Sequence, residues 1–209
     1  DARIFNMMIN SDRVMYFDQT IKKIVCLQLK DGAPLWESSA VKPKSILTHG
    51  DYVVLGPSLQ VLSVETGKLL WANGENASRG MFVSQGQIWT LSKNDKHVFG
   101  FDLATGEKRT VVDTEDFYSA GHHPRCHPVK ASENYLITAN RGSEFISLTG
   151  GEHIPNDWVR GACKYGIMPG NGMLYAPPDP CFCFPNQSVK GLNALAPAPK
   201  TSLREVSPK

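Results

Sequence analysis

The chain is short of several features that would assign it a function at once. Its 209 residues contain no run of about 18 apolar residues, so no segment predicts a membrane-spanning helix. The net charge of +2 gives no strong field for nucleic acid or for an acidic membrane surface. No stretch shows the helical periodicity of about 10–15 residues that the crossovers of a parallel sheet need. These absences disfavour nucleic acid and direct membrane insertion, and they favour antiparallel β structure.

Familiar catalytic and cofactor motifs are also missing. The sequence has no Walker phosphate loop, no glycine-rich dinucleotide fingerprint and no Gly-x-Ser-x-Gly elbow. Its five cysteines include no Cys-x-x-Cys pair, which excludes a standard haem attachment motif and the common zinc spacings. Whether the chain is an enzyme is therefore left open by its motifs.

A turn motif is present instead, and it recurs. The complete copies are Lys30–Trp36 and Glu65–Trp71, followed by the partial copy Ala104–Lys108 and the degraded copy Leu148–Glu152. The steps between the matching glycines are roughly 35, 39 and 45 residues, a period that indicates a repeat architecture. These glycines are Gly32, Gly67, Gly106 and Gly151.

Each repeat predicts four short antiparallel strands. An apolar run with alternating faces precedes the motif, glycine supplies the positive φ of a tight turn, and a return strand follows. Two further strands precede each of these hairpins, as at residues 45–48 and 52–55. Four such strands in about 40 residues predict the blade of a β-propeller, with a plain sandwich as the alternative.

The chain holds about five blades' worth of sequence. The expected boundaries are 1–40, 41–78, 79–118, 119–160 and 161–196, with a linker or tail at 197–209 rich in Pro, Ala and Ser. Most propellers of this repeat type close with more blades, so we expect the chain to be part of a larger propeller. A closed five-bladed ring is the second choice.

The repeats become irregular after Asp113. In the fourth repeat, strands are expected at 134–139 and 144–148, on either side of a turn at 140–143. The fifth repeat predicts strands at 162–168, 172–176, 180–184 and 191–195, and its Asn171-Gly172 pair is a strong hairpin signal. Because function concentrates where a regular pattern is broken, this half is the place to look for chemistry.

Half of the six histidines lie in one segment of the irregular half. His122, His123, Cys126 and His127 supply imidazole and thiolate groups, which are good ligands for a transition metal. Their spacing matches no standard zinc motif, and an ordered polar loop that caps strand ends is the alternative.

The cysteines and one arginine are further candidates. Four of the five cysteines, Cys126, Cys163, Cys181 and Cys183, fall in the irregular half, where disulfides, free thiols and a metal site all remain open. Cys26 is expected to be a small buried hydrophobic residue. Arg160 is a candidate anion contact, or a partner for an acid or carbonyl inside the fold.

The segment Leu62–Trp71 resembles the repeats of pyrroloquinoline-quinone-like propellers. This superfamily includes quinoprotein alcohol dehydrogenases and the propeller lipoprotein of the outer-membrane assembly machinery. Trp36 and Trp71 match its tryptophan-docking position, whereas Thr110 departs from it. We expect both tryptophans to pack between blades. The second half is similar to large bacterial propeller repeat proteins on residues 122–126, 134–138, 157–163, 175–183 and 192–197.

The resemblance implies a periplasmic or otherwise extracytoplasmic bacterial protein whose ring is completed by other segments or subunits. Quinoprotein dehydrogenases carry an adjacent Cys-Cys pair over the quinone, and this chain has none, so quinone binding is not expected. The leading prediction is a non-enzymatic binding or scaffold module, and the sequence assigns no cofactor to it. The alternatives are a metal- or redox-active enzyme module that uses the His and Cys cluster, and a fragment of a quinone-dependent dehydrogenase.

Overall fold

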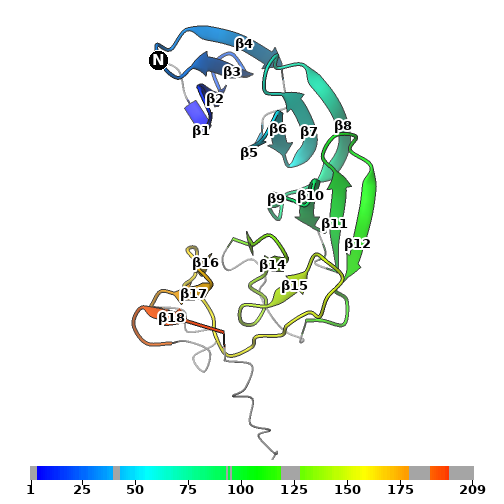
Figure 1. The fold of residues 1–209 in the computed structure, drawn as a ribbon, viewed down its shortest axis with the longest axis vertical. Helices are drawn as coiled ribbons and strands as arrows, with labels where there is room; N and C mark the ends of the chain where they lie inside the picture. Colours follow the sequence, from blue (N-terminus) through cyan, green and yellow to red (C-terminus); the bar gives the residue numbers. More distant parts are fainter. Residues whose placement is uncertain are drawn as a thin grey trace, which may run out of the picture. The chain divides into compact units, whose positions relative to one another are not determined.

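The computed structural model describes residues 4–39, 43–92, 94, 96–118, 128–178 and 189–197. The chain divides into two compact units, Asp1–Glu115 and Asp116–Lys209, called here the N-terminal and C-terminal units. Figure 1 labels the strands of both. Among the described residues no helix has the length and apolar character to cross a membrane.

The N-terminal unit contains three four-stranded antiparallel sheets, each built from strands in sequence order. The first sheet consists of β1 (Ile4–Asn10), β2 (Arg13–Asp18), β3 (Lys23–Gln28) and β4 (Pro34–Ser39). The second consists of β5 (Ser45–His49), β6 (Tyr52–Gly56), β7 (Ser58–Ser63) and β8 (Leu69–Asn76). The third consists of β9 (Met81–Ser84), β10 (Gln87–Leu91), β11 (His97–Asp102) and β12 (Lys108–Asp113).

Apolar side chains from neighbouring sheets form the core of this unit. In the first cluster Phe17 and Ile24 of the first sheet pack with Val53 and Leu62 of the second. The second cluster joins the other face of the second sheet, which includes Val61, to residues of the third. The alternation expected of each strand therefore sends successive side chains of the second sheet into two different cores.

A β-bulge occurs at the same place in all three sheets. The pairing of the third and fourth strands skips one residue, which is Leu35 in β4, Leu70 in β8 and Arg109 in β12. In each case the extra residue directly precedes the position of Trp36, Trp71 or Thr110 in the repeat. A bulge bends its strand and re-aims the next side chain, so these bulges orient the two tryptophans.

The C-terminal unit is less regular. Its described residues form two three-stranded antiparallel sheets, β13 (Lys130–Ala131), β14 (Tyr135–Ile137) and β15 (Phe145–Ser147), then β16 (Met168–Gly170), β17 (Met173–Ala176) and β18 (Asn193–Leu195). A small core connects the two sheets, and it includes Ile137, Val159 and Leu174. Asn171 and Gly172, with φ of +51° and +71°, form the predicted hairpin turn between β16 and β17.

The expected strand at 162–168 is wrong. Residues 163–165 form a turn, closed by a 2.7 Å hydrogen bond from the Gly166 N–H to the Ala162 carbonyl. A Cβ on Gly161 would lie 2.3 Å from the Gly166 carbonyl carbon, so the backbone folds back on itself here. The apolar residues of this segment predict a strand, because the turn at Lys164, with φ of +76°, has no signal in residue type.

The degraded turn at 148–152 keeps part of the repeat geometry. The Leu148 N–H donates to the Asn134 carbonyl, as Leu29, Val64 and Leu103 do to Asp12, Asp51 and Gly86 in the three regular sheets. The positive φ, however, falls on Gly150 and not on Gly151, the residue matched by sequence. The described residues confirm an all-β fold with four-stranded antiparallel sheets in the N-terminal unit, while the blade boundaries and a complete propeller stay predictions.

Candidate functional site

The predicted cluster of His122, His123, Cys126 and His127 lies outside the described residues, as do Cys181 and Cys183. Their roles as metal ligands or disulfide partners stay predictions. Within the described ranges no group of three or more His, Cys, Asp and Glu side chains is placed to hold a metal ion.

The two described cysteines lie in different surroundings. Cys26 is fully buried in β3, as expected of a small apolar residue. Burial raises the pKa of its thiol, and the nearby Arg13 guanidinium partly opposes that shift. Cys163 is half-buried in the turn at 162–166.

Each regular tryptophan docks on the turn of the following sheet. The Trp36 Nε1 donates to the Val64 carbonyl at 2.8 Å, and its ring covers Gly67 so closely that a Cβ there would lie 2.4 Å from Cε3. Trp71 repeats this geometry on the third sheet, with a 3.0 Å bond to the Leu103 carbonyl and a ring 2.6 Å from a Cβ at Gly106. Only glycine leaves room for the indole at these two turns, which explains Gly67 and Gly106.

The corresponding turn of the first sheet is open. Gly32 has the same backbone conformation, with φ of +73°, but no described atom lies within 4 Å of a Cβ built on it. Leu29 stands where Val64 and Leu103 stand in the next two repeats. Its side chain is 47% exposed, against 9% for Val64 and 6% for Leu103. The first sheet therefore presents a docking socket of the same shape, defined by Gly32 and Leu29.

A buried carboxylate organises the turn at 140–143 in the C-terminal unit. Glu144 is 2% exposed and accepts hydrogen bonds from the backbone N–H groups of Asn140, Arg141 and Gly142 at 2.6–2.8 Å. The Thr138 hydroxyl donates a fourth bond at 3.0 Å. Four donors satisfy the charge of the carboxylate and compensate for its burial.

Arg160 binds the same turn from its carbonyl side. Its side chain is fully buried, and Nη1 donates to the carbonyls of Asn140 and Arg141 at 3.1 and 2.9 Å. Glu144 thus takes the N–H groups of the turn while Arg160 takes its carbonyls. The role of Arg160 as a contact for an external anion stays a prediction.

The residues after β15 pack tightly against this turn. The Ser143 N–H donates to the Asn156 carbonyl at 2.9 Å, and the Ser143 hydroxyl donates to the Val159 carbonyl at the same distance. A Cβ on Gly142 would lie 1.8 Å from the Asn156 oxygen, so only glycine permits this approach. The turn, held by two charged side chains, therefore fixes the position of the segment 156–159.

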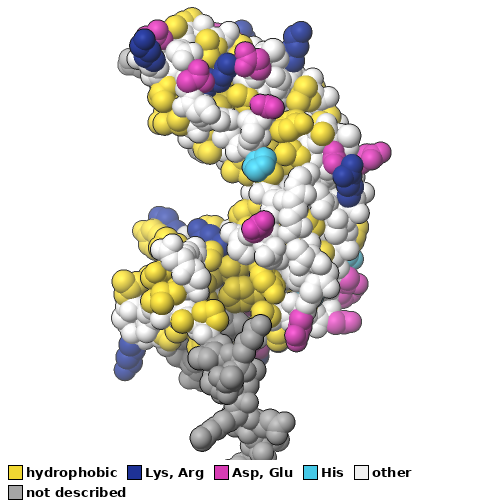
Figure 2. All heavy atoms as spheres, viewed as in Figure 1, with side chains coloured by type: hydrophobic (Ala, Val, Ile, Leu, Met, Phe, Trp, Pro, Cys, Tyr) yellow, Lys and Arg dark blue, Asp and Glu magenta, His cyan; other side chains and the backbone are white. Residues whose placement is uncertain are grey.

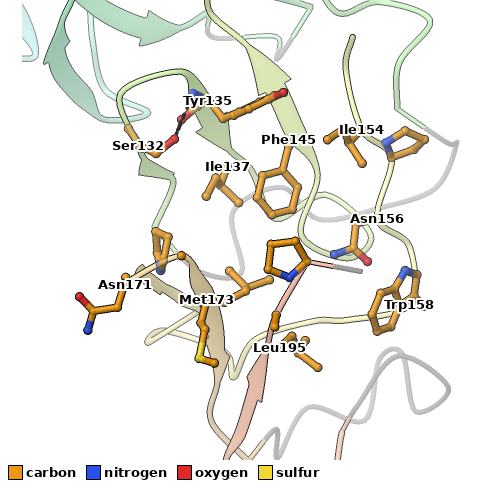
Figure 3. A pocket seen from close by; sticks show the side chains of 18 residues that line it. Ser132, Tyr135, Ile137, Phe145, Ile154, Asn156, Trp158, Asn171, Met173 and Leu195 are labelled. Carbon is orange, nitrogen blue, oxygen red and sulfur yellow. Dashed lines mark hydrogen bonds between the residues drawn. The ribbon is translucent and has the colours of Figure 1, made fainter. Parts of the chain in front are cut away.

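A pocket of about 640 Å³ opens beside that segment. Its walls come from β14, β15, the segment 154–158, the β16–β17 hairpin and residues 195–197 at the end of β18 (Figure 3). Most of the lining is apolar, and it includes Ile137, Phe145, Met173 and Leu195. Hydrophobic side chains also gather on the surface of this part of the unit (Figure 2). A concave apolar site with few polar groups is typical of ligand binding.

Some of these features are visible in the residue pattern and others are not. The docked tryptophans were found because the motif repeats. Glu144 and Asn156 were missed, since a single acid or amide in an irregular segment carries no periodic signal. Gly142, which lies in the expected turn, was the one available hint that a backbone carbonyl approaches there.

Comparisons with known proteins show a fold and no family. No protein-family model and no curated protein matches the chain. The computationally designed Ika8 protein is similar in structure, with a TM-score of 0.59, 12% identity and coverage of 83% of this chain and 55% of that one.

Two natural proteins are similar at the same level. Hydrazine synthase of Kuenenia stuttgartiensis has a TM-score of 0.53 at 14% identity, over 73% of this chain and 48% of that chain. The dihydro-heme d1 dehydrogenase NirN has a TM-score of 0.54 at 12% identity, over 74% of this chain and 37% of that chain. Both are β-propeller proteins, and this chain matches only about half or less of their length. The chain is therefore an all-β protein whose antiparallel sheets resemble those of β-propellers.

Proposed function

We propose that the chain is part of a β-propeller and acts as a non-enzymatic binding or scaffold module. The observation that carries this proposal is the open socket at Gly32 and Leu29, because the same geometry is filled by an indole at both following turns. The partner that fits this socket is another four-stranded sheet that bears a tryptophan directly after a bulge in its fourth strand. This sheet comes from a further segment of the protein or from another subunit.

The described sheets of this chain have no spare tryptophan at that position. Trp36 and Trp71 are already docked, and the third sheet carries Thr110 there, whose hydroxyl donates to Gln87. The sheet that fills the socket therefore differs from these three. The partner is accordingly distinct from a second copy of the regular sheets.

The face of the first sheet beside the socket is also suited to burial. Met7 and Ile9 of β1 are 59% and 56% exposed, although the alternate residue Met8 packs against the first core. In the second sheet both faces are covered by neighbours. The corresponding apolar face of the second sheet is covered by the first sheet. The exposed face of the first sheet therefore supports docking of a further sheet at this end.

A duplication tests this interaction. A second copy of residues 4–44 is fused in front of Asn6 of the native chain. Asn6 corresponds to Ser45, the residue that follows Lys44 in the native junction. The Trp36 of the added copy is then placed to dock in the Gly32 socket. Stacking of repeats predicts a rise in melting temperature of at least about 4 °C. In the matched control the added copy carries Trp36→Ala. Equal melting temperatures for the duplicated and native chains, or an equal gain in the control, would contradict the proposed docking.

Elemental analysis separates the scaffold from the metal or redox alternative. The proposal predicts no stoichiometric transition metal in the purified chain and no quinone absorbance band. A metal that is lost in both His122→Ala and Cys126→Ala would overturn the non-enzymatic assignment, and a quinone band would favour a dehydrogenase fragment.

The finer assignment to pyrroloquinoline-quinone-like repeats and to the bacterial periplasm rests on the resemblance of Leu62–Trp71 and of the second half of the chain. The docking of Trp36 and Trp71 supports reading these residues as the tryptophan-docking motif of that superfamily. Fractionation of the source bacterium, with an antibody against the chain, tests the location, and recovery in the cytoplasm would contradict it.

A further inference from the structure

Asn156 is a buried polar side chain in the wall of the C-terminal pocket. The residue is 8% exposed, and its Oδ1 has no hydrogen-bond partner among the residues that the structure describes. In Figure 3 its carboxamide lies among the lining side chains, beside Trp158. A buried acceptor without a donor costs free energy, and such a group in a folded protein calls for an explanation.

The fold holds Asn156 where it is. Its carbonyl accepts the Ser143 N–H and presses on Gly142, in the turn that Glu144 and Arg160 hold from both sides. The backbone that carries the acceptor is therefore held in place before any ligand arrives. A preorganised polar group in an apolar wall orients a ligand without a large cost in ordering.

The rim of the pocket is apolar and accessible. Trp158, Ile154 and Met173 are 63%, 46% and 39% exposed, and all three line the pocket. A large indole surface in water is costly unless something covers it, and an aromatic ring stacks favourably on an indole face. The volume of about 640 Å³ falls in the range of small-molecule sites.

We propose that this pocket binds a small planar aromatic molecule that carries one N–H or O–H donor. The ring packs against Trp158 and the apolar walls, and the donor bonds to the Asn156 Oδ1. This site is independent of the socket at Gly32. The proposed function does not assign it, and failure of either proposal leaves the other standing.

Two matched probes test the donor. Indole has a ring N–H, whereas 1-methylindole has nearly the same shape without it. Both are titrated into the ¹⁵N-labelled full chain while the Trp158 Nε1–H and the Asn156 side-chain amide signals are followed by NMR. We expect indole to shift these signals and to bind about fivefold to tenfold more tightly than 1-methylindole, the size of one hydrogen bond.

Two variants locate the site. Asn156→Leu removes the acceptor but keeps a similar volume, and because that acceptor is unsatisfied the change is not expected to destabilise the fold. It should abolish the difference between the two probes. Trp158→Ala should weaken both probes, whereas Tyr165→Ala, an aromatic residue 71% exposed and outside the pocket lining, should weaken neither.

Three results would overturn the proposal. The first is equal binding of the two probes to the native chain. The second is a preference for indole that persists in Asn156→Leu. The third is the absence of any shift at Trp158 up to the solubility limit of indole, which would assign the Asn156 acceptor to an ordered water.

Discussion

The two units solve the same packing problem in different ways. In the N-terminal unit the sheets are four-stranded, and each tryptophan anchors one sheet to the turn of the next through a ring contact and one hydrogen bond. In the C-terminal unit the described sheets have three strands, and a buried carboxylate and guanidinium hold an irregular turn in place. The regular half is stabilised by apolar docking, and the irregular half by polar contacts to a turn that lies beside a pocket.

The two kinds of contact differ in the room that they leave for a binding site. A docked indole lies so close to the glycine of the next turn that any side chain there would overlap the ring. A turn held by Glu144 and Arg160 does not need a tryptophan from a neighbouring repeat. It therefore allows the following segment to diverge and to line a cavity.

Blocking the tryptophan contact gives the largest effect. In Gly67→Ala the new Cβ overlaps the Trp36 ring and also sits at a φ of +67°, so we expect a loss of about 3 kcal/mol in the free energy of unfolding. Urea denaturation measures it, and hydrogen exchange should localise the loss to the N-terminal unit. The matched control is Gly50→Ala, where φ is +53° and no described atom lies within 4 Å. It should lose only about 1 kcal/mol. Equal losses would show that the backbone conformation, and not the docked indole, requires glycine.

Disturbing the polar turn comes next. Glu144→Gln places an amide NH₂ against backbone N–H donors, and we expect a loss of about 2 kcal/mol, with faster hydrogen exchange confined to the C-terminal unit. Glu152→Gln changes an exposed acid of the same unit and should remain within about 0.5 kcal/mol of the native chain. If both variants behave alike, the buried carboxylate does not organise the turn.

The Asp102 carboxylate should make a smaller contribution to the stability of the N-terminal unit, which is lost in acid. Hydrogen bonds to Asp102 from the Thr105 backbone and hydroxyl and from the Ala104 N–H, with the nearby Arg109 guanidinium, lower the pKa of this carboxyl below its ordinary value of 3.8. Its stabilisation is therefore complete above that value and disappears as the pH falls through the lowered pKa. Asp102→Asn should flatten the acid limb of a stability-versus-pH curve, measured by thermal melting. Asp51→Asn serves as an exposed control, and an unchanged limb in Asp102→Asn would contradict the assignment.

The smallest effect concerns Cys26. Because burial raises the pKa of its thiol above 9.0, its contribution to stability is present below pH 9 and is lost as the pH rises beyond that value. At neutral pH we expect iodoacetamide to label Cys26 at least about 100-fold more slowly in the native chain than in urea. Peptide mass spectrometry measures the two rates. Comparable rates would mean that the first core opens far more readily than its packing suggests.

Much of the regular half was predictable because its signals repeat. The strands before each turn, the hairpin glycines and the positions of Trp36 and Trp71 all follow from period and residue type. The bulges at Leu35, Leu70 and Arg109 were not predictable, since they arise from how the fourth strand pairs and no one residue type is found at all three positions. The strand expected at 162–168 failed for a related reason, because a close approach of two glycines outweighed an apolar run.

The candidate pocket, and the place of Asn156 in its wall, could not be predicted from the sequence. Nothing near Asn156 distinguishes it from any loop amide. It becomes notable only because Gly142, Glu144 and Arg160 bring its backbone against a turn 14 residues earlier. The predicted His and Cys cluster was visible in composition, yet its geometry lies outside the described residues.

The sequence by itself determined the all-β class, the repeat and the residues that dock between sheets, because local alternation and glycine turns act over a few residues. Only the tertiary structure decided which turn is covered by no described side chain and which buried acceptor has no partner among the described residues. Both depend on what lies across from a residue in space. A repeat specifies its own strands, but whether its turn is covered depends on the neighbouring sheet.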